Sequence, residues 1–108
     1  MSKIRALITL ARPHQYIKNV FIFLPIFFAH KLFDSQALIQ TGWAFVVFCL
    51  GASSVYIVND IFDVAVDRVH PVKKHRPLAA GILEKREAFL FAANLLVLSI
   101  LLSIYKLG

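Results

Sequence analysis

Three aspartates near the middle of the chain, Asp60, Asp63 and Asp67, are spaced to act together. They follow residues 35–58, a run that contains no charged residue. In a helix, each residue advances by about 100°, so the three carboxylates would share one face within an arc of roughly 60°. Like charges this close repel one another, and a helix C-terminus disfavours anions further. Because a hard divalent cation prefers oxygen ligands, the pattern predicts a Mg²⁺ site.

A basic loop begins directly after the last aspartate and includes four cations, Arg68, Lys73, Lys74 and Arg76. Carboxylates bind Mg²⁺, Mg²⁺ binds diphosphate oxygens, and Arg or Lys neutralises the remaining phosphate charge. The combination therefore predicts chemistry on a departing diphosphate. Two plainer interpretations stay open: basic loops are ordinary on the cytoplasmic side of a membrane, and the aspartates would then only pair with Arg68 and its neighbours. For His70, next to Pro71, we favour a turn-fixing or substrate-contacting role over proton transfer.

The composition is that of a membrane protein. Of the 108 residues, 59% are hydrophobic, whereas soluble domains have about 45–50% apolar residues. The net charge is +6, but the basic residues are clustered and form no soluble basic face, so we expect no nucleic-acid partner. The single cysteine, Cys49, excludes a disulfide within the chain.

The pattern of apolar residues predicts three transmembrane helices, at about residues 16–33, 37–66 and 86–105, with one loop at about 67–85. The second segment exceeds the roughly 20 residues that cross a bilayer. Its end should therefore project from the hydrocarbon and carry the aspartates.

The basic residues orient these spans. Only Lys31 and Lys106 lie on one side of the predicted membrane. All the others lie on the opposite side: Lys3, Arg5, Arg12, Lys18, Arg68, Lys73, Lys74, Arg76, Lys85 and Arg86. By the positive-inside rule, the N-terminus and the loop at 67–85 should be cytoplasmic, in an inner or plasma membrane.

The aspartates belong to a pattern, Asn59-Asp60-x-x-Asp63-x-x-x-Asp67-Arg68 followed by Arg76-Pro77. It resembles the first aspartate-rich motif of the UbiA superfamily of intramembrane prenyltransferases. Residues 12–19 and 70–81 resemble one branch, the decaprenyl-phosphate phosphoribosyltransferases. Tyr16, where that branch usually has tryptophan, is a departure.

The resemblance implies an all-α membrane protein that corresponds to the first third of a nine-helix bundle. It also implies roles for individual residues. Asn59, Asp60 and Asp63 would hold Mg²⁺ on the donor diphosphate, and Asp67 would join through water or orient neighbouring cations. The residues expected to bind phosphate are Lys18, Arg68, Lys73 and Arg76, with Asn19 and His70 as further substrate contacts.

The reaction implied is Mg²⁺-dependent transfer of phosphoribose from phosphoribosyl diphosphate to polyprenyl phosphate, at the membrane. An aromatic or quinone-type prenyltransferase is an alternative, and so is a non-catalytic membrane fragment or subunit. Nothing after Glu87 carries a carboxylate side chain, so the family's second aspartate-rich motif is missing. We therefore expect no activity from this segment alone, and a complementary chain with the remaining helices would be its partner.

Overall fold

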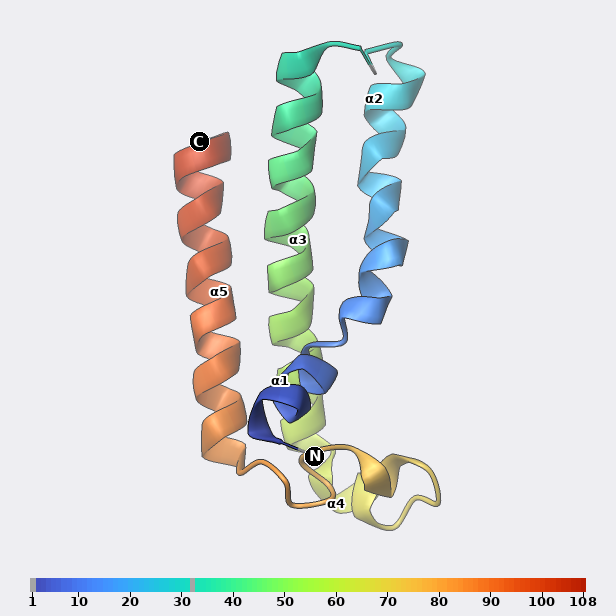
Figure 1. Cartoon of the computed structure of the whole chain (residues 1–108), viewed down its shortest axis with the longest axis vertical. Coiled ribbons are helices and arrows are strands. Elements are labelled where there is room, and N and C mark those ends of the chain that lie inside the picture. The colour runs from blue at the N-terminus through green and yellow to red at the C-terminus, as the bar shows by residue number, and fades with distance from the viewer. Residues whose placement is uncertain (1, 32) are drawn as a thin grey trace.

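Three helical columns lie side by side in the computed structural model, which describes residues 2–31 and 33–108 (Figure 1). The N-terminus and the loop before α5 lie at one end of the columns, and the C-terminus lies towards the other. This agrees with the alternating topology predicted from the charges. The described residues contain no strand, and their helical elements are α1 (Lys3–Ala11), η1 (Pro13–Phe23), α2 (Leu24–Phe28), α3 (Ser35–Phe62), α4 (Val64–Arg68), η2 (Lys73–His75) and α5 (Lys85–Leu107).

The first column is made of η1 and α2 and differs from the predicted span at 16–33. It begins earlier, at Pro13, and ends earlier, at Phe28, while residue 32 lies outside the described part of the chain. Pro25 lies in the first turn of α2, directly after the change from 3₁₀ to α conformation. With rises of about 2.0 Å and 1.5 Å per residue, the two pieces together reach roughly 30 Å, about the thickness of a hydrocarbon core.

The second column, α3, ends four residues before the predicted limit of 66, which was wrong. The helix begins at a strong cap, because Asp34 Oδ1 accepts hydrogen bonds from the backbone N–H groups of Gln36 and Ala37. It stops at Asp63, which has φ −91° and ψ 2°, and the short helix α4 follows. The break falls at Asp63, between the other two aspartates of the motif.

The third column, α5, agrees with the predicted span at 86–105 and begins with a capping box between Glu84 and Glu87. Serines join it to α3: Ser99 Oγ donates to the carbonyl of Val47 at 2.8 Å, and Ser54 Oγ donates to that of Ala92 at 3.0 Å. Small residues let two helices approach closely enough for such bonds.

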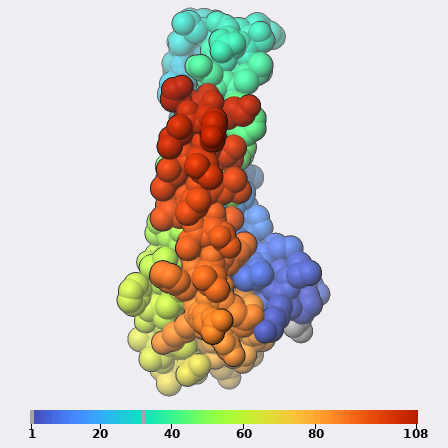
Figure 2. Space-filling model, turned by 90° about the vertical axis from the view of Figure 1, so that its left-hand side faces the viewer, coloured from blue at the N-terminus to red at the C-terminus, as the bar shows by residue number. Residues whose placement is uncertain are grey.

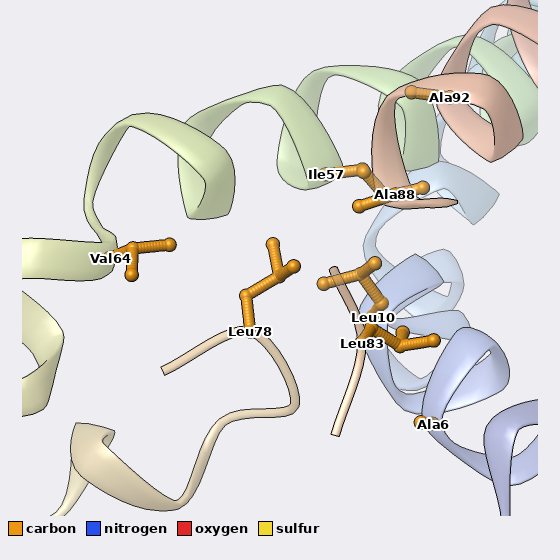
Figure 3. Packing of buried hydrophobic residues seen from close by; sticks show 8 residues of the cluster. All are labelled: Ala6, Leu10, Ile57, Val64, Leu78, Leu83, Ala88 and Ala92. Carbon is orange, nitrogen blue, oxygen red and sulfur yellow. The ribbon is translucent and has the colours of Figure 1, made fainter. Parts of the chain in front are cut away.

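Most buried apolar side chains gather at one end of the molecule. Leu10 of α1, Ile57 of α3, Val64 of α4 and Leu78 of the loop point towards one another there (Figure 3). The rest of the cluster is Ala6, Leu83, Ala88 and Ala92. We call this end, residues 2–12 and 57–92, the base, and the remainder of the described chain the shaft.

The shaft is long and thin, as Figure 2 shows for the face of α5. The radius of gyration is 16.5 Å, whereas a globular domain of this length would have about 13 Å. Helices α3 and α5 are both long and apolar enough to cross a membrane. Most of their surface is exposed, as expected for helices that face lipid. The all-α architecture is confirmed for residues 2–31 and 33–108, and two of the three predicted spans, α3 and α5, meet the test of length and composition for a membrane helix.

Candidate functional site

A cavity of about 630 Å³ opens at the base, where the α1–η1 junction faces the loop after α4. We call it the basal cavity. It is lined by Thr9, Arg12, His14, Gln15, Asp60, His70, Val72, Lys73, His75, Arg76 and Pro77. Three of these residues are permanent cations and one is a carboxylate, so the lining has an excess of positive charge. Such a surface is suited to an anion, and arginine in particular binds phosphate with two parallel hydrogen bonds.

Four charged side chains form one network beside this cavity. Arg12 Nη2 donates to Asp60 Oδ1 at 2.5 Å, and Arg76 Nη1 lies 3.3 Å from the same oxygen. Arg76 Nη1 also donates to Asp67 Oδ2 at 3.2 Å. Both carboxylates are 3% exposed. Because a buried carboxylate is costly without a charged partner, the two arginines are what allow the aspartates to lie inside.

Arg12 reaches Asp60 because of an unusual backbone conformation. It is the C-cap of α1 and has φ 55° and ψ 56°, in the left-handed region that non-glycine residues seldom occupy. Its N–H donates to the carbonyl of Thr9, and Pro13 starts the next helix. The guanidinium lies over the ring of Tyr56, 5.0 Å from its centroid. Sequence reasoning did not select Arg12 for the site, because no local pattern indicates its contact with Asp60, 48 residues away.

The prediction of three aspartates on one face is wrong for Asp63. The chain leaves the regular helix at this residue, so its side chain is exposed while those of Asp60 and Asp67 are buried. Asn59 is also exposed. In residues 2–31 and 33–108, no three His, Cys, Asp or Glu side chains are grouped closely enough to hold a metal ion by themselves. The structure thus brings together two of the four proposed ligands.

The predicted phosphate-binding residues divide into two groups. Lys73 and Arg76 line the basal cavity. Arg68 is exposed, and its Nε donates to the carbonyl of Ala79 at 3.4 Å instead. Lys18 lies beside a different cavity of about 300 Å³ in the shaft. The expectation that it reaches the aspartates is not met, because η1 carries it away from the base.

Asn19 and His70, the two further residues expected to contact substrate, lie beside different cavities. Asn19 lines the shaft cavity with Lys18, and its Nδ2 donates to Cys49 Sγ at 3.4 Å. His70 lines the basal cavity, and its Nδ1 accepts from the N–H groups of Val72 at 3.1 Å and Lys73 at 3.0 Å. These bonds confirm a turn-fixing role. They also assign the proton of the neutral ring to Nε2, which remains able to donate.

Comparison with known proteins identifies relatives of the whole segment. A model described as the UbiA prenyltransferase family matches residues 19–108. Decaprenyl-phosphate phosphoribosyltransferase from Corynebacterium glutamicum is 46% identical over 94 residues, 85% of this chain and 28% of that protein. The protein of the same name from Mycolicibacterium smegmatis is 40% identical over 106 residues, 93% of this chain and 33% of that protein.

A third relative has a different name. Digeranylgeranylglyceryl phosphate synthase from Methanocaldococcus jannaschii is 43% identical over 61 residues, 56% of this chain and 20% of that protein. The chain thus spans a third or less of the length of each of these three relatives. The family match includes the aspartates and the loop that lines the basal cavity.

Proposed function

Because the chain belongs to the UbiA prenyltransferase family, we propose that its base forms part of a transferase site for a diphosphate substrate. The observation that carries this proposal is the basal cavity itself. Three cations line it beside two buried, arginine-paired carboxylates, at the end of a helix long enough to cross a membrane. This arrangement suits a donor with a charged diphosphate that reacts with a lipid acceptor.

The specific reaction that we propose is transfer of phosphoribose from phosphoribosyl diphosphate to a polyprenyl phosphate such as decaprenyl phosphate. The names of the two relatives that align with most of this chain support it. A phosphate oxygen of the acceptor would form a bond to the anomeric carbon of ribose as the bond to diphosphate breaks. An ionised phosphate is already nucleophilic, so the main task of the protein is positioning and charge stabilisation.

We propose Mg²⁺ as the cofactor, with the buried Asp60 and Asp67 as its direct ligands and the exposed Asn59 and Asp63 as ligands through water. Mg²⁺ usually binds one or two carboxylates together with waters and substrate phosphates, rather than a complete protein cage. The buried pair Asp60 and Asp67 fits that requirement, because a single atom, Arg76 Nη1, is within 3.3 Å of an oxygen of each. When bound, the cation would neutralise charge on the diphosphate as it leaves.

Lys73 and Arg76 would bind the phosphate oxygens, since both line the basal cavity. His70 Nε2 would donate a hydrogen bond to the same substrate while Nδ1 keeps its turn in place. We assign no such role to Lys18, Asn19 or Arg68, which do not line this cavity.

We further propose that the base faces the cytoplasm of an inner or plasma membrane, because most Lys and Arg residues of the chain lie in the base, at residues 2–12 and 57–92. The relatives are about three times as long or longer. The activity is therefore proposed for this chain acting with the helices that those relatives have in addition, from the same or a complementary chain.

An isoprenyl diphosphate is the second candidate donor, supported by the family description and by the synthase from M. jannaschii. To distinguish the donors, the chain would be co-expressed with the additional helices of a relative in membranes. Each radiolabelled diphosphate would then be supplied with its acceptor, and the lipid product counted. We expect transfer from phosphoribosyl diphosphate, at least tenfold reduced in Asp63→Asn and unchanged in Asp34→Asn.

Product from isoprenyl diphosphate alone would favour the second candidate. Equal turnover by wild type and Asp63→Asn would contradict the metal assignment. Absence of product from either donor, with wild type correctly inserted, would favour a non-catalytic membrane subunit.

A further inference from the structure

Arg12 is joined to the proposed site in three ways that its sequence position does not reveal. Its guanidinium binds the buried Asp60 at 2.5 Å, lies over Tyr56 and lines the basal cavity. The side chain remains 23% exposed, so one part of it faces the carboxylate and another faces the cavity. A guanidinium has five N–H groups, and among residues 2–31 and 33–108 only one of its nitrogen atoms, Nη2, donates a hydrogen bond, to Asp60.

Contacts with Ser53 of α3 flank Arg12 on both sides, one through the backbone of Ala11 and one through the side chain of Tyr16. Ser53 Oγ donates to the carbonyl of Ala11 at 2.6 Å, and the hydroxyl of Tyr16 lies 2.5 Å from the same Ser53 Oγ. With Asp60, these contacts fall on one face of α3, at positions 53 and 60. The junction between α1 and η1 is therefore held in place. A change in the contacts of Arg12 would move its side chain and leave its backbone where it is.

Two guanidinium groups already compete for one carboxylate oxygen, Asp60 Oδ1. A divalent cation at that oxygen would lie beside two positive charges and displace at least one of them, which weakens binding of the cation alone. A cation that arrives with diphosphate changes this balance, because phosphate oxygens offer the displaced guanidinium a new partner. Arg12 is the better candidate for the exchange, since Arg76 also holds Asp67.

We propose that Arg12 is a positioning residue with two alternative partners, an inference that rests on the proposed function. It holds Asp60 while no diphosphate is present and transfers to the diphosphate when a cation and diphosphate bind together. Arg12 would thereby couple the two ligands, so that each strengthens binding of the other.

The test is equilibrium dialysis of the chain, co-expressed with the additional helices of a relative and held in phospholipid nanodiscs, with Mn²⁺ and radiolabelled inorganic pyrophosphate as probes. Both probes are counted on each side of the dialysis membrane, and the excess on the protein side gives the bound amount, because the complex that the two form in solution is equal on both sides. In wild type, we expect pyrophosphate to increase Mn²⁺ affinity about tenfold or more. In Arg12→Gln, Mn²⁺ alone should bind about tenfold more tightly, and the gain from pyrophosphate should largely disappear. Arg12→Lys should retain part of the gain, because it keeps the charge without the planar fork.

Arg5→Gln is the matched control, since it removes a cation from the exposed part of the same helix and should change neither affinity. Circular dichroism would verify that each variant keeps its helical content, and Arg12→Lys carries the test if Arg12→Gln does not fold. Coupling in wild type that is unchanged in both Arg12 variants would overturn this inference and leave the proposed function standing. Failure of wild type to bind Mn²⁺ and pyrophosphate would overturn both.

Discussion

The base and the shaft of this protein are stabilised by different kinds of interaction. In the described residues, buried apolar side chains concentrate in the base, and the shaft contributes only Ile26 and Cys49 to them. The base also buries two carboxylates, each with an arginine partner. Polar burial in the shaft is limited to serine hydroxyls, which bind backbone carbonyls.

This difference follows from the solvent that each region meets. Lipid tails are as apolar as leucine, so helices in a bilayer gain little by hiding apolar side chains from them. Their association relies on close packing and interhelical hydrogen bonds, which the serines and Gly51 of the shaft provide. In the orientation proposed above, the base contacts water and polar headgroups, where burial of apolar groups is favourable and charges must be paired. The polar site therefore lies beside the main cluster of buried apolar side chains in the described residues.

The largest loss of stability should come from a substitution in the apolar core of the base. Ile57 is fully buried, and Ile57→Ala should lower the free energy of unfolding by about 2–4 kcal/mol through lost contacts and a cavity. Val55, two residues away on α3, is 57% exposed and provides the control. The free energy of unfolding of both variants is measured by following helicity while sodium dodecyl sulfate is titrated into mixed micelles. A loss for Val55→Ala as large as that for Ile57→Ala would show that base and shaft do not differ.

Removal of the ion pairs of the base should cause the next largest loss of stability. Asp60→Asn removes the charge that two arginines share. We expect a loss of about 2 kcal/mol, less than for a fully buried pair because the guanidinium groups keep some access to water. Asp63→Asn alters an exposed aspartate three residues later and should change the free energy of unfolding by less than about 0.5 kcal/mol. Equal losses in the same titration would contradict the division of the aspartates into paired and exposed.

A smaller effect is expected for a hydrogen bond of the shaft. Ser99→Ala removes the 2.8 Å bond from its hydroxyl to the carbonyl of Val47, which should cost about 0.6 kcal/mol. Ser103, on the next turn, makes no side-chain hydrogen bond among residues 2–31 and 33–108, so Ser103→Ala is the matched control. Disulfide cross-linking between cysteines placed on α3 and α5 would report how closely the helices pack. An unchanged yield together with unchanged stability would show that close packing alone joins α3 and α5.

The smallest effect concerns the exposed pair at the edge of the base. The hydrogen bond from Lys3 Nζ to Glu87, 2.9 Å long, raises the pKa of Lys3 above its ordinary value. A raised pKa means that the folded state binds this proton more tightly, so the contribution is present at neutral pH and is lost as pH rises through the folded-state pKa. Wild type should be slightly more stable than Lys3→Gln at pH 7, with the difference vanishing as pH rises above the folded-state pKa of Lys3, and also at high salt. A difference that persists under both conditions would exclude the ion pair as its cause.

Much of the architecture follows from local sequence pattern. Long apolar runs, proline at the start of η1 and the Glu84 and Glu87 pair before α5 specify where helices begin, because these signals act within a few residues. The charge bias predicted that the N-terminus and the loop would share one end, as Figure 1 shows. The resemblance carried by the aspartate motif also identified the correct family.

The sequence by itself therefore determined an all-α membrane chain of this family, with a charged cluster at one end. Only the tertiary structure decided which charges meet. A helical rotation of about 100° per residue predicts neither the break at Asp63 nor the exposure of its side chain. Nor does any local pattern predict that Arg12 would contact Asp60, 48 residues away, because a left-handed junction and its bonds to α3 bring them together.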